Sequence, residues 1–165
     1  TIVRSEQLME KTSREDEFVR NYEMAERYNI TSPIPTGAKL QSLNMIRPTI
    51  GIITQHFNPT MEHHGVDIAA KPQESVVAVM DGTVVLSTYT SGYGYILCLS
   101  HPGGLMSIYK HCESLLKQQG DKVKQGDVIA LVSGSRTVYL SNPHLHFELW
   151  YEGQPIDPEK YILFQ

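Results

Sequence analysis

Apolar and polar residues alternate in short runs through the later and larger part of the chain. These runs are rich in β-branched and aromatic residues, and glycine, proline or aspartate separates them, as in SVVAVMDGTVVLSTY, YGYILCLS, GLMSIYKH, DVIALV and HLHFELWY. Asp81-Gly82 and the segment His101–Gly104 are turn signals that join neighbouring runs into hairpins. One stretch, 113–119, has helical character. Turn signals about every ten residues predict a mainly β domain, an antiparallel sandwich or barrel.

The start of the chain follows a helical pattern instead. Ser13 with Asp16 approximates a capping box, and apolar residues then recur at helical spacing up to Asn29, which can end a helix. Prolines and a glycine in TSPIPTGAK follow and indicate a linker. We therefore expect a helical segment over 1–32, a linker and lead-in over 33–49, and the β domain over 50–165. The helix either packs on this domain, or serves as a spacer toward an upstream anchor or as a contact for a protein partner.

Composition narrows the classes of function. The chain has 165 residues, of which 41% are hydrophobic and 19% charged, as in a folded domain with a small appendage. Its net charge is −4 and the sequence has no basic cluster, so nucleic-acid binding is not expected. The sequence contains no run of about 18 apolar residues, so no transmembrane segment is expected within it. Because the sequence starts at Thr1 without a methionine, we expect that an export signal or a membrane anchor lies upstream of it.

The two cysteines, Cys98 and Cys112, lie on either side of the second predicted hairpin turn. A register that pairs Ser100 with Leu105 puts their sulfurs about five residues apart along the ladder, or roughly 16 Å. A disulfide needs Cα atoms within about 7 Å of each other. We therefore expect two free thiols.

The clearest chemical signal is the pair His144 and His146 in the run NPHLHFELW. Side chains alternate between the faces of a strand, so these two imidazoles share one face and Leu145 points to the other. Histidines on a face that is otherwise buried need hydrogen-bond partners or a metal ion. The two imidazoles are about 7 Å apart on a flat strand, which is far for two ligands of the same small ion. It is easier for one histidine to bind a metal ion and for the other to be a catalytic or supporting group.

Two weaker signals lie elsewhere in the chain. His63 and Asp67 are four residues apart in EHHGVDIAA, and Gly65 between them permits a sharp bend that would bring imidazole and carboxylate together. In SIYKHC, Tyr109 and His111 are expected to share one face of a strand. Each signal alone also fits an ordinary hydrogen-bonded histidine. Together they supply two or three histidines and one carboxylate, which is the ligand chemistry of a mononuclear zinc hydrolase.

The motifs HHGVDIAA, SIYKH and PHLHFELW, in this order, resemble those of the LytM or lysostaphin type of zinc peptidoglycan endopeptidases. The connecting runs VVAVMDGTVV, YGYILCLSHPGG and GDKVKQGDVIALV are similar as well. The resemblance implies a folded-over antiparallel sheet sandwich of the duplicated hybrid motif type. It also implies one zinc ion per chain, held by His63, Asp67 and His146, with His111 and His144 as the catalytic histidines beside it.

The resemblance covers about Ile50 to Tyr161 and has one departure. Where the family usually carries a glycine-rich loop, this chain has GSRTVYLSNP, with bulky residues and Asn142 over 138–142. This loop would border the substrate groove, so the departure bears on substrate fit and not on metal binding. Among the other histidines, His64 is not expected to be a ligand and His101 is expected to be structural, while His56 has no assignment.

Three functions follow from these observations. The first is a zinc endopeptidase of the cell envelope that cuts peptide cross-links between the peptide stems of bacterial peptidoglycan. The second is a non-catalytic wall-binding or amidase-activating domain on the same fold; the presence of all five site residues disfavours it. The third is a biotinyl or lipoyl carrier module, suggested by GDKVKQGDVIALV, but the turns at Asp81-Gly82 and His101–Gly104 lack the lysine that would carry the group.

Overall fold

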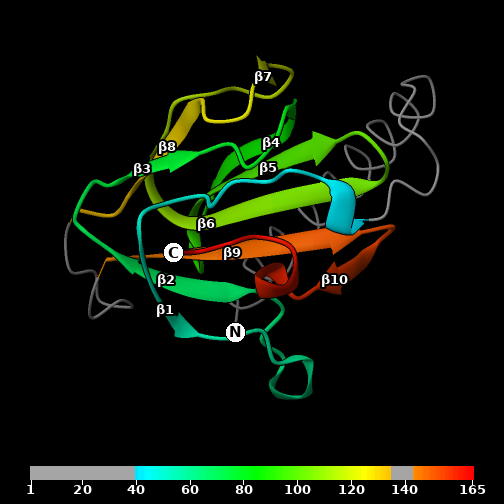
Figure 1. The fold of residues 1–165 in the computed structure, drawn as a ribbon. Coiled ribbons are helices and arrows are strands. Elements are labelled where there is room, and N and C mark those ends of the chain that lie inside the picture. Colours follow the sequence, from blue (N-terminus) through cyan, green and yellow to red (C-terminus); the bar gives the residue numbers. More distant parts are fainter. Residues whose placement is uncertain (1–39, 135–142) are drawn as a thin grey trace, which may run out of the picture.

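The computed structural model describes residues 40–134 and 143–165 (Figure 1). The predicted helix over 13–29 and the 138–142 loop lie outside these residues. The strands are β1 (Gly51–Gln55), β2 (Val66–Ala70), β3 (Ser75–Val77), β4 (Gly82–Thr90), β5 (Gly94–His101), β6 (Leu105–Leu115), β7 (Lys122–Val123), β8 (Val128–Val132), β9 (His144–Tyr151) and β10 (Gln154–Ile156). Short 3₁₀ turns occur at η1 (Leu40–Ser42), η2 (Pro59–Met61) and η3 (Pro158–Lys160). No helix in the described part is long and apolar enough to cross a membrane.

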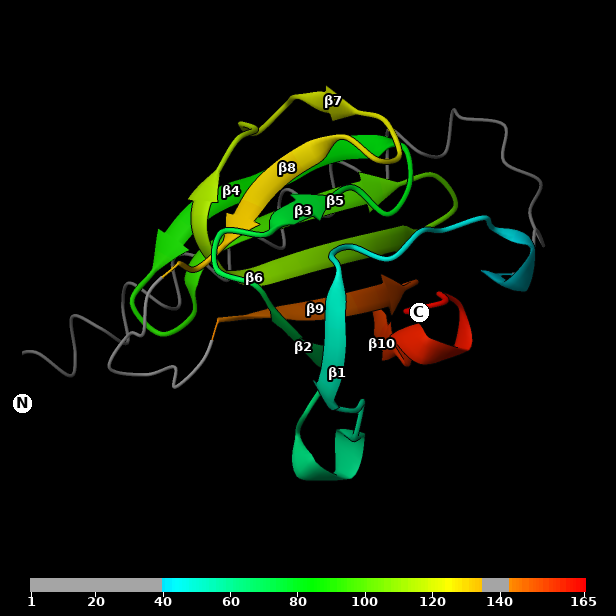
Figure 2. The same ribbon diagram turned by 60° about the vertical axis from the view of Figure 1, so that its left-hand side comes forward.

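All strand pairs are antiparallel, and the main sheet has the order β1-β2-β9-β6-β5-β4-β7. Strand β8 pairs with β6 and also with β3, so the sheet branches at β6. In Figure 2 the β3–β8 pair lies over β4 and β5, which gives the folded-over arrangement. The predicted mainly β, antiparallel architecture is confirmed.

The branch point of the sheet is a bulge in β6. Lys110 is the last residue of β6 that pairs with β9, and from Cys112 onward β6 pairs with β8. The ladder with β5 shifts here because two residues of β6, Lys110 and His111, lie opposite Ile96. His111 has a positive φ of 66°, which is uncommon for a residue other than glycine. A bulge of this kind bends the strand and turns a side chain to the other face.

The bulge overturns one prediction. Tyr109 points into the main core, where its ring lies 5.3 Å from that of Phe147, centroid to centroid. His111 lies instead beside His146, on the opposite face of the sheet. The prediction that Tyr109 and His111 share a face was wrong, because the extra residue reverses the alternation.

The main core fills the space between the folded-over strands. Leu145, Phe147 and Leu149 of β9 all point into it and are fully buried. Since side chains alternate along a strand, His144 and His146 lie together on the other face, as predicted. A second, smaller apolar cluster lies on that other face, formed by Val85, Leu86, Ile96, Cys98, Met106 and Ile108 with Trp150 packed against it.

Two further expectations concern β5 and β6. The hairpin register is His101 with Leu105 and Cys98 with Ile108, so the predicted pairing of Ser100 with Leu105 was wrong by one residue. Both cysteines are nevertheless free and buried, as predicted. The predicted helical stretch over 113–119 was also wrong, because pairing with β8 extends β6 to Leu115.

Candidate metal centre

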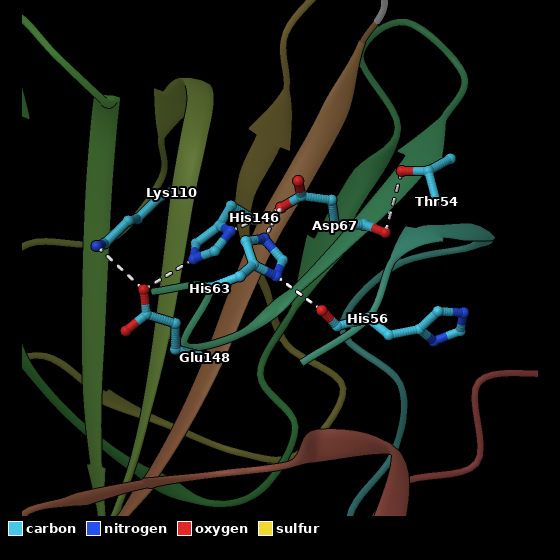
Figure 3. A network of polar contacts seen from close by, with 7 residues as sticks. All are labelled: Thr54, His56, His63, Asp67, Lys110, His146 and Glu148. Atoms are coloured by element: carbon cyan, nitrogen blue, oxygen red, sulfur yellow. Dashed lines mark hydrogen bonds and ion pairs between the residues drawn. The ribbon is translucent and has the colours of Figure 1, made fainter. Parts of the chain in front are cut away.

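A row of polar side chains crosses adjacent strands on the face opposite the main core (Figure 3). Asp67 of β2 pairs with His146 of β9, and His146 pairs in turn with Lys110 of β6. Directly paired side chains on one face have Cβ atoms about 4.5–5.5 Å apart. The register of the sheet therefore brings together residues that are far apart in the sequence.

His63 reaches the same place from the loop before β2. A 3₁₀ turn precedes it, Glu62 adopts a left-handed conformation, and His63 then bridges Asn58 before a bend at Gly65. His63 Nε2 lies 3.4 Å from Asp67 Oδ1, so the bend brings imidazole and carboxylate together, as predicted. The reason for glycine is space: a Cβ at Gly65 would lie 2.3 Å from the carbonyl oxygen of Phe147.

Three potential ligand atoms converge here, one each from His63, Asp67 and His146, all within 4.8 Å of one another. His63 Nε2 is buried and has no hydrogen-bond partner among the described residues. His146 Nδ1 is only 2.6 Å from Asp67 Oδ1, the separation of a short hydrogen bond in which the imidazole nitrogen donates to the carboxylate. An unpartnered imidazole nitrogen beside a second imidazole and a carboxylate fits the ligand set of zinc.

The other nitrogen of each imidazole is held from behind. Nδ1 of His63 donates to the backbone carbonyl of His56 at 2.9 Å. Nε2 of His146 donates to Oε2 of Glu148 at 2.8 Å. These acceptors fix which nitrogen of each ring faces the converging site, as is usual for histidines that bind metals.

Glu148 is a residue that the sequence reasoning missed. Its side chain is 7% exposed and also pairs with Lys110 Nζ at 3.1 Å, while Trp150 Nε1 donates to Oε1 at 2.7 Å. Burial would raise the pKa of Glu148, but the bond to His146 and the charge of Lys110 outweigh it and lower the pKa to about 2. Strand alternation could have found this residue, because Glu148 is two positions after His146 and so shares its face.

The converging groups also shift one another's pKa values. Burial raises the pKa of Asp67, but the hydrogen bond with His146 and the charges of nearby histidines outweigh it, so the pKa lies below its usual value. Burial lowers the pKa of His146, but its bonds to Asp67 and Glu148 outweigh it, so the pKa lies above its usual value. Asp67 and His146 therefore hold the proton between them strongly when no metal is bound.

His111 and His144 lie next to this group. Their ring centroids are 5.0 Å apart, and that of His111 is 6.2 Å from His146. Burial, with the charges of His144 and His146 next, lowers the pKa of His111 to about 4, so its imidazole is neutral near pH 7. The bulge in β6 places the His111 side chain on the same face as His146. The position of His144 on that face follows from the alternation of side chains along β9.

The remaining histidines lie elsewhere. His56 is exposed, and its Nδ1 lies within hydrogen-bond distance of Oε2 of Glu159, at 2.7 Å. His101 is fully buried and bonds to the carbonyl of Asp81 at 2.8 Å, in keeping with the structural role expected for it. His64 does not belong to the group of converging ligand atoms found in the described residues.

Comparisons with known proteins bear on this arrangement. Residues 61–158 match peptidase family M23. The chain is 32% identical over 117 residues to the murein hydrolase activator NlpD of Salmonella dublin, a match that covers 70% of this chain and 30% of NlpD. It is 34% identical over 96 residues to the DD-carboxypeptidase/endopeptidase Mpg of Neisseria meningitidis serogroup B, covering 58% of this chain and 22% of Mpg. The chain thus spans less than a third of the length of these relatives.

Solved structures share the fold. A zinc-containing peptidase from Vibrio cholerae is 28% identical with a TM-score of 0.62, and the match covers 70% of this chain and 39% of that one. The peptidase lysostaphin from Staphylococcus simulans is 24% identical with a TM-score of 0.59, covering 67% of this chain and 48% of that one; this similarity concerns the fold alone. The resemblance to the LytM or lysostaphin type is confirmed.

Proposed function

The chain belongs to peptidase family M23, and we propose that it is a zinc-dependent endopeptidase that cuts peptide cross-links of bacterial peptidoglycan. One observation carries the proposal. His63 Nε2, Asp67 Oδ1 and His146 Nδ1 converge, and acceptors behind both imidazoles hold them in the orientation that a metal needs. Such an arrangement favours a working metal site over a remnant of one.

We assign His63, Asp67 and His146 as the zinc ligands. They provide two nitrogens and one carboxylate oxygen, which is a common set for a catalytic zinc that keeps one position open. Zinc bound there would polarise the scissile carbonyl and lower the pKa of a water molecule toward about 7.

His111 and His144 are the proposed catalytic residues. They come from two different strands and their rings are 5.0 Å apart, so both can face a peptide bond that lies over the ligands. One imidazole would take the proton from the attacking water and later give it to the leaving amine. The other would donate a hydrogen bond to the oxygen on which negative charge develops.

The proposed substrate is the cross-linked peptide of peptidoglycan, and the proposed location is the cell envelope. The names of the relatives support this, since Mpg is called a DD-carboxypeptidase/endopeptidase and NlpD a murein hydrolase activator.

The second candidate function is activation of a separate murein hydrolase. The similarity to NlpD, at 32% identity over 70% of this chain, favours it. Activation by itself calls for a surface that contacts the partner hydrolase. The converging ligand atoms and the acceptors behind them suit a bound metal instead, and this is why we favour the enzyme.

The deciding experiment is digestion of purified peptidoglycan by zinc-loaded protein, with detection of new amine ends by mass spectrometry. New amine ends that disappear after chelation of the metal and return with zinc would support the endopeptidase. A zinc-loaded protein that releases no amine ends, but accelerates a purified amidase on the same substrate, would support the activator instead.

A further inference from the structure

We infer that Glu148 is a positioning residue that holds Nδ1 of His146 ready to bind the metal. It does this by accepting the proton of the opposite nitrogen of the same ring. The inference rests on the proposed function, because it assumes that His146 binds zinc through Nδ1. It adds to that function a carboxylate that touches neither the metal nor the substrate.

Both oxygens of Glu148 are already committed. Oε2 lies 2.8 Å from Nε2 of His146 and 3.1 Å from Nζ of Lys110, while Oε1 accepts from Nε1 of Trp150 at 2.7 Å. With its side chain 7% exposed, the carboxylate is shielded from most of the water that would weaken these bonds. Glu148 is therefore fixed in one orientation by groups on two strands.

The consequence for His146 is a defined proton position. A neutral imidazole carries one proton, on either of its two nitrogens. Without a metal, Asp67 accepts from Nδ1 and Glu148 accepts from Nε2. When a metal displaces the proton of Nδ1, the carboxylate of Glu148 keeps the remaining proton on Nε2, so the lone pair of Nδ1 is directed at the converging site. Without an acceptor behind the ring, the remaining proton could sit on Nδ1 beside Asp67 and block the metal.

Glu148 is not a fourth ligand in this geometry. It is bonded to the nitrogen of His146 that points away from Asp67, and it does not belong to the group of atoms that converge. Lys110 supports this view, because its ammonium compensates the carboxylate and is itself held 4.5 Å from the centroid of the Tyr93 ring. A charged group with its own counterion is suited to stand behind a ligand.

The test compares zinc affinity in variants of the full chain. Glu148→Gln keeps the shape and an oxygen that can accept from Nε2 but loses the charge, whereas Glu148→Leu loses both. Glu152→Gln is the matched control, since it makes the same change at an exposed residue of the turn after β9. Competition with a chromophoric chelator gives the dissociation constants, and circular dichroism with thermal melting reports folding.

We expect zinc affinity to fall about 10–100-fold for Glu148→Leu, and by less for Glu148→Gln. The control should bind as wild type. In ¹H–¹⁵N spectra of zinc-loaded wild-type protein, the proton of His146 should reside on Nε2. If Glu148→Leu fails to fold, the zinc affinity of the isosteric variant Glu148→Gln, compared with that of wild type, decides whether Glu148 has this role.

Two results would overturn the inference, and they differ in what else they overturn. Equal zinc affinities for wild type and a folded Glu148 variant would overturn the role of Glu148 and leave the proposed metal site standing. A wild-type protein that binds no zinc would overturn the inference and the proposed function together.

Discussion

Asp67 and His146 stand directly opposite each other on β2 and β9, and Oδ1 of the carboxylate lies 2.6 Å from Nδ1 of the imidazole. His146 also donates from Nε2 to Glu148, so the ring without metal carries protons on both nitrogens, in agreement with its raised pKa. A metal that binds between Asp67 and His146 must displace one of these protons.

The first prediction follows from this proton. The protein should bind about one zinc per chain, and binding should release a proton near neutral pH, since the raised pKa of His146 keeps the ring charged to higher pH than usual. Titration calorimetry in buffers with different ionisation enthalpies measures the release. Elemental analysis without zinc, even after dialysis against it, would remove the enzyme hypothesis.

The second prediction separates ligand from catalyst on β9. His146→Ala should lose zinc and activity together, because even changes behind a ligand commonly weaken metal binding about 10–100-fold. His144→Ala and His111→Ala should keep zinc and lose about 10²–10⁴-fold in rate. Zinc content and cleavage rate must be measured on the same preparations. If His144→Ala emptied the site while His146→Ala stayed metallated, the two roles would have to be exchanged.

The third prediction concerns Gly65. A Cβ at this position would meet the Phe147 carbonyl oxygen at 2.3 Å, so Gly65→Ala should push β2 away from β9 and destabilise the fold by about 1–3 kcal/mol. Zinc affinity should fall as well, since Asp67 would move from His146. Gly92→Ala is the control, because nothing lies within 4 Å of a Cβ there. Equal urea midpoints for the two variants would contradict the close approach of the strands.

The fourth prediction concerns His101 and pH. Burial lowers its pKa to about 4 in the folded state, from 6.5 in the unfolded chain. The unfolded state therefore takes up a proton that the folded state refuses between these values, so stability falls as pH drops from about 6.5 to about 4. At about pH 5 this costs about 2 kcal/mol. His101→Asn keeps a donor for the Asp81 carbonyl but cannot titrate, and its free energy of unfolding should change less between about pH 7.5 and about pH 5.

The fifth prediction concerns the thiols. Cys98 and Cys112 are both buried, and burial raises the pKa of each, that of Cys112 to about 12. The thiolate is the reactive form, so both should react with a thiol reagent only after unfolding. Titration should count two thiols in the denatured, unreduced protein and almost none in the native one. Rapid labelling of the native protein would show that these residues are accessible.

The sequence by itself determined the period of the strands and, with it, much of the chemistry. Alternation along HLHFELWY places His144 and His146 on one face, and the turn signals predict the mainly β fold. The same alternation places Glu148 on that face, but no pattern in the sequence indicates that its carboxylate accepts a hydrogen bond from His146. Local patterns suffice for these features because side-chain direction within a single strand depends only on the backbone.

The tertiary structure alone decided how the strands meet. The registers that set Asp67 against His146, and His146 against Lys110, depend on contacts between segments that are distant in sequence. The positive φ of His111 occurs where β6 leaves β9 for β8, and the bulge there puts this side chain on the face opposite to the one that alternation predicts. A one-residue change of register or a bulge moves a side chain to the other face of a sheet, so only the assembled sheet determines which residues share the metal centre.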